Sequence, residues 1–214
     1  MMKILHKLLA LVAFMGMQVS ADGAHKDHKV EFAFTANQIV PDVIVKAPDH
    51  LLGVKYEKSK KVVYLGNELA PMDVREQPTI TFDADPDDFY TIVMTDPDAP
   101  SRANPVSREF RHWLVGNIPG LNISKGQSLT QYAGSGPPKD SGLHRYILLL
   151  YKQPKKIRFD EKIVSNTEVG DRPQFSIQKF SEKYDLQLIA GNFFQAQYDD
   201  SVPELHKQLG IGQA

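Results

Sequence analysis

The chain contains no cysteine, and this absence excludes both disulfide bonds and any metal site built on thiolate ligands. A domain of this size needs neither, because roughly 200 residues can bury enough apolar surface to fold unaided. The 214 residues are 42% hydrophobic and 24% charged, a composition typical of one folded globular domain and not of a disordered chain.

The sequence also lacks an excess of either charge, and it lacks a long basic run. Its formal net charge is −1, so no basic face is expected that would collect the phosphates of a nucleic acid. Neither H-E-x-x-H nor G-x-S-x-G occurs, and "GSGPPKD" (134–140) has no Lys-Ser/Thr pair of a nucleotide-binding loop. We therefore expect no nucleic-acid partner, no cofactor and no metal.

No apolar run is long enough to cross a bilayer. The N-terminus has Lys3 and Lys7, then an apolar run of about 12 residues from Leu8 to Val19, against roughly 20 for a membrane span. Small residues follow, so the pattern predicts a secretory signal peptide over residues 1–21, cleaved after Ala21. The alternative is an N-terminal membrane anchor. A signal peptide predicts a secreted, extracellular domain over residues 22–214, without a transmembrane segment.

Asn122 begins the sequence "NIS", which is an acceptor pattern for N-glycosylation in a secreted chain. A three-residue pattern occurs often by chance, so the sequence alone leaves open whether Asn122 is modified.

Most of the chain reads as short strands separated by Pro, Gly, Asn and Asp. The predicted strands are 42–46, 54–57, 61–65, 79–83, 90–95, 112–118 and 145–151. The runs "YTIVM" and "YILLLY" do not alternate between polar and apolar residues, which predicts central strands that are covered on both faces.

Two helices are predicted near the C-terminus. Ile177, Phe180 and Tyr184 share one helical face, and "SVPELHKQL" opens with a capping-box pattern from Ser201 to Glu204. No repeat, linker or low-complexity tract divides the chain, so the fold class is a mainly β single domain with a few peripheral helices.

Three stretches place ionisable side chains where a stiff loop meets a predicted strand. "TDPDAPSRANP" (95–105) holds Asp96 and Asp98 among three prolines, which restrict the backbone. "SREFRHW" (107–113) brings His112 to the start of a strand, and "GSGPPKDSGLHRY" (134–146) leads into another. Such rims are where a rigid scaffold presents a binding site.

Each stretch also has a purely structural interpretation. Aspartates in a proline-rich loop often form turns, His112 beside Trp113 could be a satisfied core histidine, and Arg145 could simply pair with Asp98. Taken singly, none of the three stretches decides between these interpretations and a binding site.

Together, the motifs resemble the phosphatidylethanolamine-binding protein family, also known for Raf kinase inhibition. The resemblance rests on "DPDAP" (96–100), "REFRHWLVGNIPG" (108–120) and "GSGPPKDSGLHRYILLLY" (134–151), and it continues into "FQAQYDDSVPELHKQL" (194–209). Long motifs in this order cover most of the mature chain. The resemblance marks the chain as similar to secreted invertebrate members of the family.

The resemblance implies a large central β-sheet packed on a smaller one, with peripheral helices and a small anion-binding pocket at one end. It also implies cis bonds at Ala99-Pro100 and Arg108-Glu109. The expected ligand is a phospholipid head group or another small phosphate-bearing molecule. The residues expected to bind it are Asp96, Asp98, His112, Gly136, Pro137, Pro138, His144, Arg145, Tyr146 and His206.

Physical chemistry refines that expectation, because bare carboxylates repel a bound phosphate. We therefore expect Asp98 to pair with Arg145 as support and Asp96 to orient or charge a histidine, while His112 and loop N–H groups contact the anion. His206 stands where family members often carry a tyrosine at the pocket mouth, and Lys179 stands where the kinase-inhibitory members carry a phosphorylated serine.

Three functions compete at this point. The first is a secreted, non-catalytic binding protein for a phospholipid head group or another small anionic or amphipathic ligand, with odorant carriage as one role of that kind. The second is an extracellular serine protease inhibitor. The third is a hydrolase that uses His112 with Asp96, which we disfavour because no serine, threonine or cysteine nucleophile accompanies them.

Overall fold

A computed structural model describes residues 27–212 of the chain. The predicted signal peptide and its cleavage site at Ala21 lie outside these residues. The described residues contain no helix that is long and apolar enough to span a bilayer.

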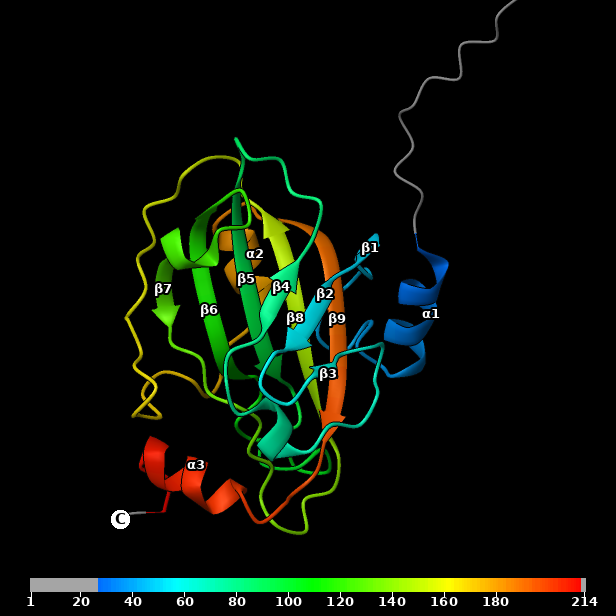
Figure 1. The fold of residues 1–214 in the computed structure, drawn as a ribbon, viewed down its shortest axis with the longest axis vertical. Helices are drawn as coiled ribbons and strands as arrows, with labels where there is room; N and C mark the ends of the chain where they lie inside the picture. Colours follow the sequence, from blue (N-terminus) through cyan, green and yellow to red (C-terminus); the bar gives the residue numbers. More distant parts are fainter. Residues whose placement is uncertain (1–26, 213–214) are drawn as a thin grey trace, which may run out of the picture.

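The structure is mainly β, with helices at its periphery (Figure 1). In chain order, the α-helices and strands are α1 (His28–Ala36), β1 (His50–Leu51), β2 (Gly53–Tyr56), β3 (Lys61–Val62), β4 (Thr79–Thr81), β5 (Phe89–Asp96), β6 (Phe110–Pro119), β7 (Gln127–Thr130), β8 (His144–Lys152), α2 (Ile177–Lys183), β9 (Gln187–Ala196) and α3 (Val202–Leu209). Short 3-10 helices cover Pro71–Val74 (η1) and Ile123–Lys125 (η2).

The strands form a large and a small sheet. The large sheet has the order β1-β9-β8-β5-β6-β7, in which β1 pairs parallel to β9 and all other pairs are antiparallel. The small sheet has the order β3-β2-β4, and in Figure 1 it lies over one face of the large sheet. The predicted arrangement of a large sheet packed on a smaller one is confirmed.

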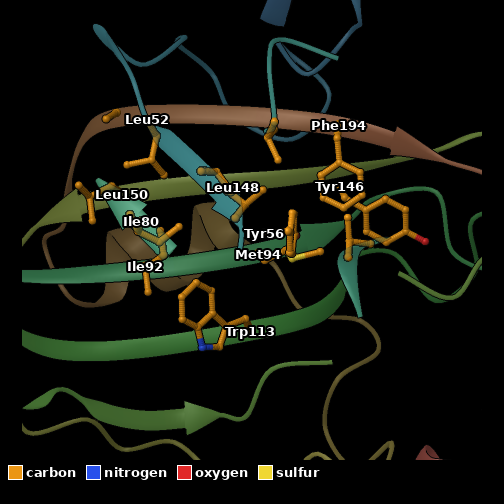
Figure 2. Packing of buried hydrophobic residues seen from close by; sticks show 14 of the residues in the cluster. Leu52, Tyr56, Ile80, Ile92, Met94, Trp113, Tyr146, Leu148, Leu150 and Phe194 are labelled. Carbon is orange, nitrogen blue, oxygen red and sulfur yellow. The ribbon is translucent and has the colours of Figure 1, made fainter. Parts of the chain in front are cut away.

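Alternate residues of the central strands enter two separate cores. Ile92 and Leu148 belong to the core between the two sheets, which Figure 2 shows with Trp113 and Phe194. Val93 and Leu149 belong to the second core on the opposite face, together with buried residues of α1 and α2. Both faces of β5 and β8 are therefore covered, as the non-alternating apolar runs predict.

The helix and strand predictions were right for most elements and wrong for several. The predicted strand at 42–46 is a turn and bend, because the N–H groups of Val43 and Ile44 both bond back to the carbonyl of Ile39. Adjacent Val43 and Ile44 are both buried, which an alternating strand with one covered face would not allow. The sequence analysis missed α1, β1, β7 and β9.

Both C-terminal helices exist, but the predicted capping box of α3 does not form. Ser201 occupies the N-cap position in a helical conformation (φ −86, ψ −19), and its side chain accepts no bond from the helix. Its hydroxyl donates to Asp199 instead. The N-cap side chain reaches the helix only from an extended backbone, which Ser201 lacks.

Candidate functional site

The topology of the large sheet gathers the three predicted stretches at one edge. Strand β5 ends at Asp96, and it runs antiparallel to both β6 and β8, which begin near Phe110 and at His144. The end of β5 therefore lies beside the starts of its two neighbours. The predicted cis bonds at Ala99-Pro100 and Arg108-Glu109 are both present at this edge.

Asp98 and Arg145 form a buried ion pair that supports the edge. Arg145 donates from Nε to Oδ2 of Asp98 over 2.9 Å and from a terminal nitrogen to Oδ1 over 2.6 Å. The same guanidinium also reaches Asp42 and the carbonyls of Asn37 and Gln38. Burial acts to raise the pKa of Asp98, but Arg145 outweighs it, and the net pKa is lowered. The predicted pairing of Asp98 with Arg145 is confirmed.

Asp96 orients His144. Its Oδ1 accepts the backbone N–H of Asp98 over 2.7 Å, and its Oδ2 lies 2.8 Å from Nδ1 of His144. On the other side of the ring, Nε2 of His144 lies 2.9 Å from Oγ of Ser141. The sequence analysis missed Ser141, whose place in this chain only the folded loop reveals.

The chain Ser141–His144–Asp96 has the order of a hydrolase triad but not its proton arrangement. The hydroxyl of Ser141 donates to the carbonyl of Pro138 over 2.7 Å, so its proton is not directed at His144. Ser141 is also absent from the residues that line the adjacent cavity. These contacts favour a structural role for the serine in the 134–146 loop.

His112 is held by a different partner. Its Nδ1 lies 3.1 Å from the carbonyl oxygen of Ala133. A carbonyl only accepts, so Nδ1 carries the proton of the neutral ring and Nε2 is left as an acceptor. Nε2 is buried and has no partner among the described residues. The neutral ring therefore presents an acceptor and not a donor at Nε2. His112 lines the pocket as predicted, and its contact with an anion stays a prediction.

These side chains border a cavity of about 310 Å³, at the lower end of the volume range of small-molecule sites. Of the predicted residues, those that line it are Asp96, His112, Gly136, Pro138, His144, Tyr146 and His206. Those outside the lining are Asp98, Pro137 and Arg145, which are buried behind it. Asp98 and Arg145 bond to each other and do not line the cavity. They were predicted both as ligand-binding residues and as a supporting pair, and the structure agrees with the supporting role.

Sequence reasoning missed most of the apolar part of the cavity. The missed lining residues are Ser107, Phe110, Val169, Pro173, Leu205, Leu209 and Ile211, and Ala99 and Pro100 of the first loop complete the wall. Leu205 and Leu209 were detectable in principle, because their i,i+4 spacing puts them on the same face of α3.

Helix α3 lies across the end of the large sheet in Figure 1 and forms one wall of the cavity. His206 binds this helix to the 134–146 loop, since its Nε2 lies 2.8 Å from the carbonyl oxygen of Gly136. His206 thus lines the cavity where α3 meets the 134–146 loop, a position that is consistent with its predicted place at the pocket mouth.

A second depression, of about 1070 Å³, lies on the other side of Leu205. Its charged side chains neutralise each other, as in the pairs Lys58–Glu76 and Arg75–Glu204. None of the buried polar atoms without a partner belongs to its lining in the described part of the chain. The smaller cavity, which contains two such atoms in His112 and Tyr146, is the better candidate site.

Asn122 is exposed in the turn before η2, where its Oδ1 accepts a bond from the Ser124 hydroxyl. An enzyme that attaches a glycan could reach it. Its glycosylation stays a prediction.

Comparisons with known proteins agree with this fold and with the motifs at its edge. The family profile described as Phosphatidylethanolamine-binding protein matches residues 59–194. A Drosophila melanogaster protein named "Putative odorant-binding protein A5" is 40% identical over 205 residues, which cover 95% of this chain and 97% of that protein.

Two solved structures extend the comparison. The carboxypeptidase Y inhibitor, solved in complex with its cognate proteinase, is 33% identical with a TM-score of 0.69 over 79% of this chain and 95% of its own. The solution structure of CG7054 is 44% identical with a TM-score of 0.66 over 80% of this chain and 97% of its own. The chain therefore belongs to the phosphatidylethanolamine-binding protein family, and both the predicted family and the predicted fold class are confirmed.

Proposed function

We propose that the mature chain is a secreted, non-catalytic protein that binds the polar head group of a phospholipid, or of another small anionic or amphipathic ligand, in the 310 Å³ cavity. The observation that carries this proposal is a pair of buried polar atoms without partners, Nε2 of His112 and the hydroxyl of Tyr146. Leaving such groups unpaired costs about 1 to 3 kcal/mol each, which a polar ligand recovers. The name of the Drosophila relative, an odorant-binding protein, agrees with binding of a small ligand.

The cavity has a polar and an apolar part, as an amphipathic ligand requires. Asp96, His144 and Tyr146 come from the sheet and form the polar part, whereas Leu205 and Leu209 of α3 belong to the apolar part. Tyr146 also stacks on Phe194 with ring centroids 5.0 Å apart, a contact within the core shown in Figure 2. This packing fixes the position of the hydroxyl.

Phosphoethanolamine should bind the mature chain and raise its melting temperature. At a hundredfold excess over the dissociation constant, a ligand that binds only the folded state raises the free energy of unfolding by about 2.7 kcal/mol. A thermal shift assay measures this effect. The substitution His112→Ala removes a hydrogen-bond partner of the head group, so we expect it to weaken binding by about 1.5 to 3 kcal/mol.

The matched control is His28→Ala, because the side chain of His28 is 81% exposed on α1. This variant should bind like the parent. The proposal fails if phosphoethanolamine gives no shift, or if the His112→Ala protein, still folded, binds it as tightly as the parent protein does.

Inhibition of a protease is the second candidate function. It is favoured by the likeness to the carboxypeptidase Y inhibitor, at 33% identity and a TM-score of 0.69. In that case a surface segment and not the cavity would make the decisive contacts, so His112→Ala would leave inhibition unchanged. Hydrolysis is the weakest candidate, because the hydroxyl of Ser141 donates away from His144.

A further inference from the structure

The side chains in the polar part of the cavity offer a ligand more acceptors than donors. His112 contributes a bare nitrogen, because its Nδ1 proton is committed to the carbonyl of Ala133. Burial raises the pKa of the Tyr146 hydroxyl, and Asp96 and Gly136 lie close enough to shift it as well, but the hydroxyl forms a well-aligned hydrogen bond with neither residue. It is both a donor and an acceptor, so it fits either kind of partner.

Burial keeps His112 neutral at physiological pH. The ring is only 4% exposed, and this burial lowers its pKa to about 4, although Asp96 acts in the opposite direction. Arg172 lowers the pKa further. The ionisable groups around the cavity are Asp96 on β5, His144 and Tyr146 on β8 and His206 on α3, and none of them removes the preference for the uncharged ring.

The histidine and arginine donors near the cavity are already engaged. Both ring nitrogens of His144 have partners, in Asp96 and Ser141. Nε2 of His206 is bound to the carbonyl of Gly136. No lysine or arginine lines the cavity in the described part of the chain, and the guanidinium of Arg145 is locked to Asp98 behind it. Among the side chains that line the cavity, the hydroxyls of Tyr146 and Ser107 are thus the donors still available to a ligand, and each can also accept.

From this imbalance we infer that the cavity selects ligands whose polar head carries an O–H or N–H group to donate to Nε2 of His112, with an apolar body against α3. The inference rests on the proposed function and names the ligand class. A buried acceptor rejects an analogue that cannot donate to it, because the acceptor then stays unpaired. Alcohols and protonated amines meet the requirement. A phosphodiester lipid meets it only if its head group has an O–H or N–H, as the ammonium of an ethanolamine head group does.

The most direct test compares two isomers, heptan-1-ol and 1-methoxyhexane, by titration calorimetry. They have the same atoms and nearly the same apolar surface, but only the alcohol donates a hydrogen bond. We expect the alcohol to bind at least about tenfold more tightly, the factor that corresponds to one recovered hydrogen bond. In a His112→Phe protein this preference should vanish. Leu209→Ala should weaken the binding of both ligands and leave the ratio of their dissociation constants unchanged.

A second comparison uses short-chain lipids. Dihexanoyl lipids with an N,N-dimethylethanolamine or a choline head differ by one methyl group, and only the first retains an N–H. We expect the dimethylethanolamine lipid to bind at least about tenfold more tightly than the choline lipid.

The outcomes separate this inference from the proposed function. If the alcohol is preferred and neither lipid binds, donor selection stands and lipid binding fails. If both lipids bind equally and the two isomers bind equally, the proposed function stands and donor selection is overturned. Failure of all four probes to bind overturns both.

Discussion

Replacing Arg145 with methionine should lower the free energy of unfolding by about 3 to 5 kcal/mol, the usual cost of leaving a buried charge without its partner. Asp98 is 0% exposed, and the variant would leave its carboxylate with the backbone N–H of residue 145 and with the guanidinium of Arg108, which lies farther away at 3.9 Å. Trp113 is the single tryptophan and is 1% exposed, so its fluorescence reports unfolding in urea.

Two further variants give this experiment its control and its internal check. Arg75→Met breaks the exposed pair with Glu204 and should cost less than about 1 kcal/mol. Adding Asp98→Asn to Arg145→Met removes the stranded charge and should restore part of the loss. A loss below about 1 kcal/mol for Arg145→Met would contradict the supporting role of the pair.

The second large effect concerns Glu109, which is 6% exposed. Its carboxylate accepts bonds from the Thr95 hydroxyl and the Ile177 N–H, and it has no ion-pair partner in the described part of the chain. Burial raises its pKa from 4.5 to about 7. Below pH 4.5 both states hold the proton. Between pH 4.5 and 7 the unfolded chain releases the proton while the folded chain retains it. The contribution of Glu109 to the free energy of unfolding therefore falls as the pH rises to about 7, and above that it stays constant.

Glu109→Gln should remove this loss. Relative to the parent, the free energy of unfolding of the variant should rise by roughly 3 kcal/mol between pH 4.5 and pH 7.5. The measured quantity must be the difference in the free energy of unfolding between the variant and the parent, because the contribution of His112 changes with pH in the opposite direction and is common to both proteins. Its folded pKa of about 4 lies below the ordinary 6.5, so its contribution is lost as pH falls through this window. The exposed Glu182→Gln is the control, and an equal pH profile for Glu109→Gln and the parent would refute the prediction.

The central strands were predictable because their apolar runs are continuous, but β9 was not. Gly191 and Asn192 interrupt the apolar pattern of β9, and both residue types are typical of turns. In the structure a Cβ at Gly191 would lie 2.8 Å from Pro48, so the glycine permits close packing. Asn192 donates to the carbonyls of Leu52 and Val63, which directly flank β2 and β3, and thereby joins β9 to the ends of these strands. Both roles depend on residues far away in the sequence, which a local pattern does not contain.

The candidate site was predictable in its polar part and in the 134–146 loop, but not in most of its apolar wall. Asp96, His112 and His144 stand at strand ends, where the sequence itself marks them. Val169 and Pro173 reach the cavity because Arg172, which is 0% exposed, binds their loop to the sheet. It does so by donating to the carbonyls of Arg111, His112 and Gln131. An arginine that binds distant carbonyls leaves no periodic signal, so the apolar wall could not be inferred.

The central claim is that a ligand head group binds at His112 in the 310 Å³ cavity. A crystal structure of the mature chain with phosphoethanolamine tests it most directly. We expect an N–H or P–OH of the ligand within about 3 Å of Nε2 of His112, with Nδ1 still on the carbonyl of Ala133. Phosphoethanolamine bound in the second depression, which Arg75 and Glu204 line, would contradict the claim. So would phosphoethanolamine bound in the cavity without a donor on Nε2.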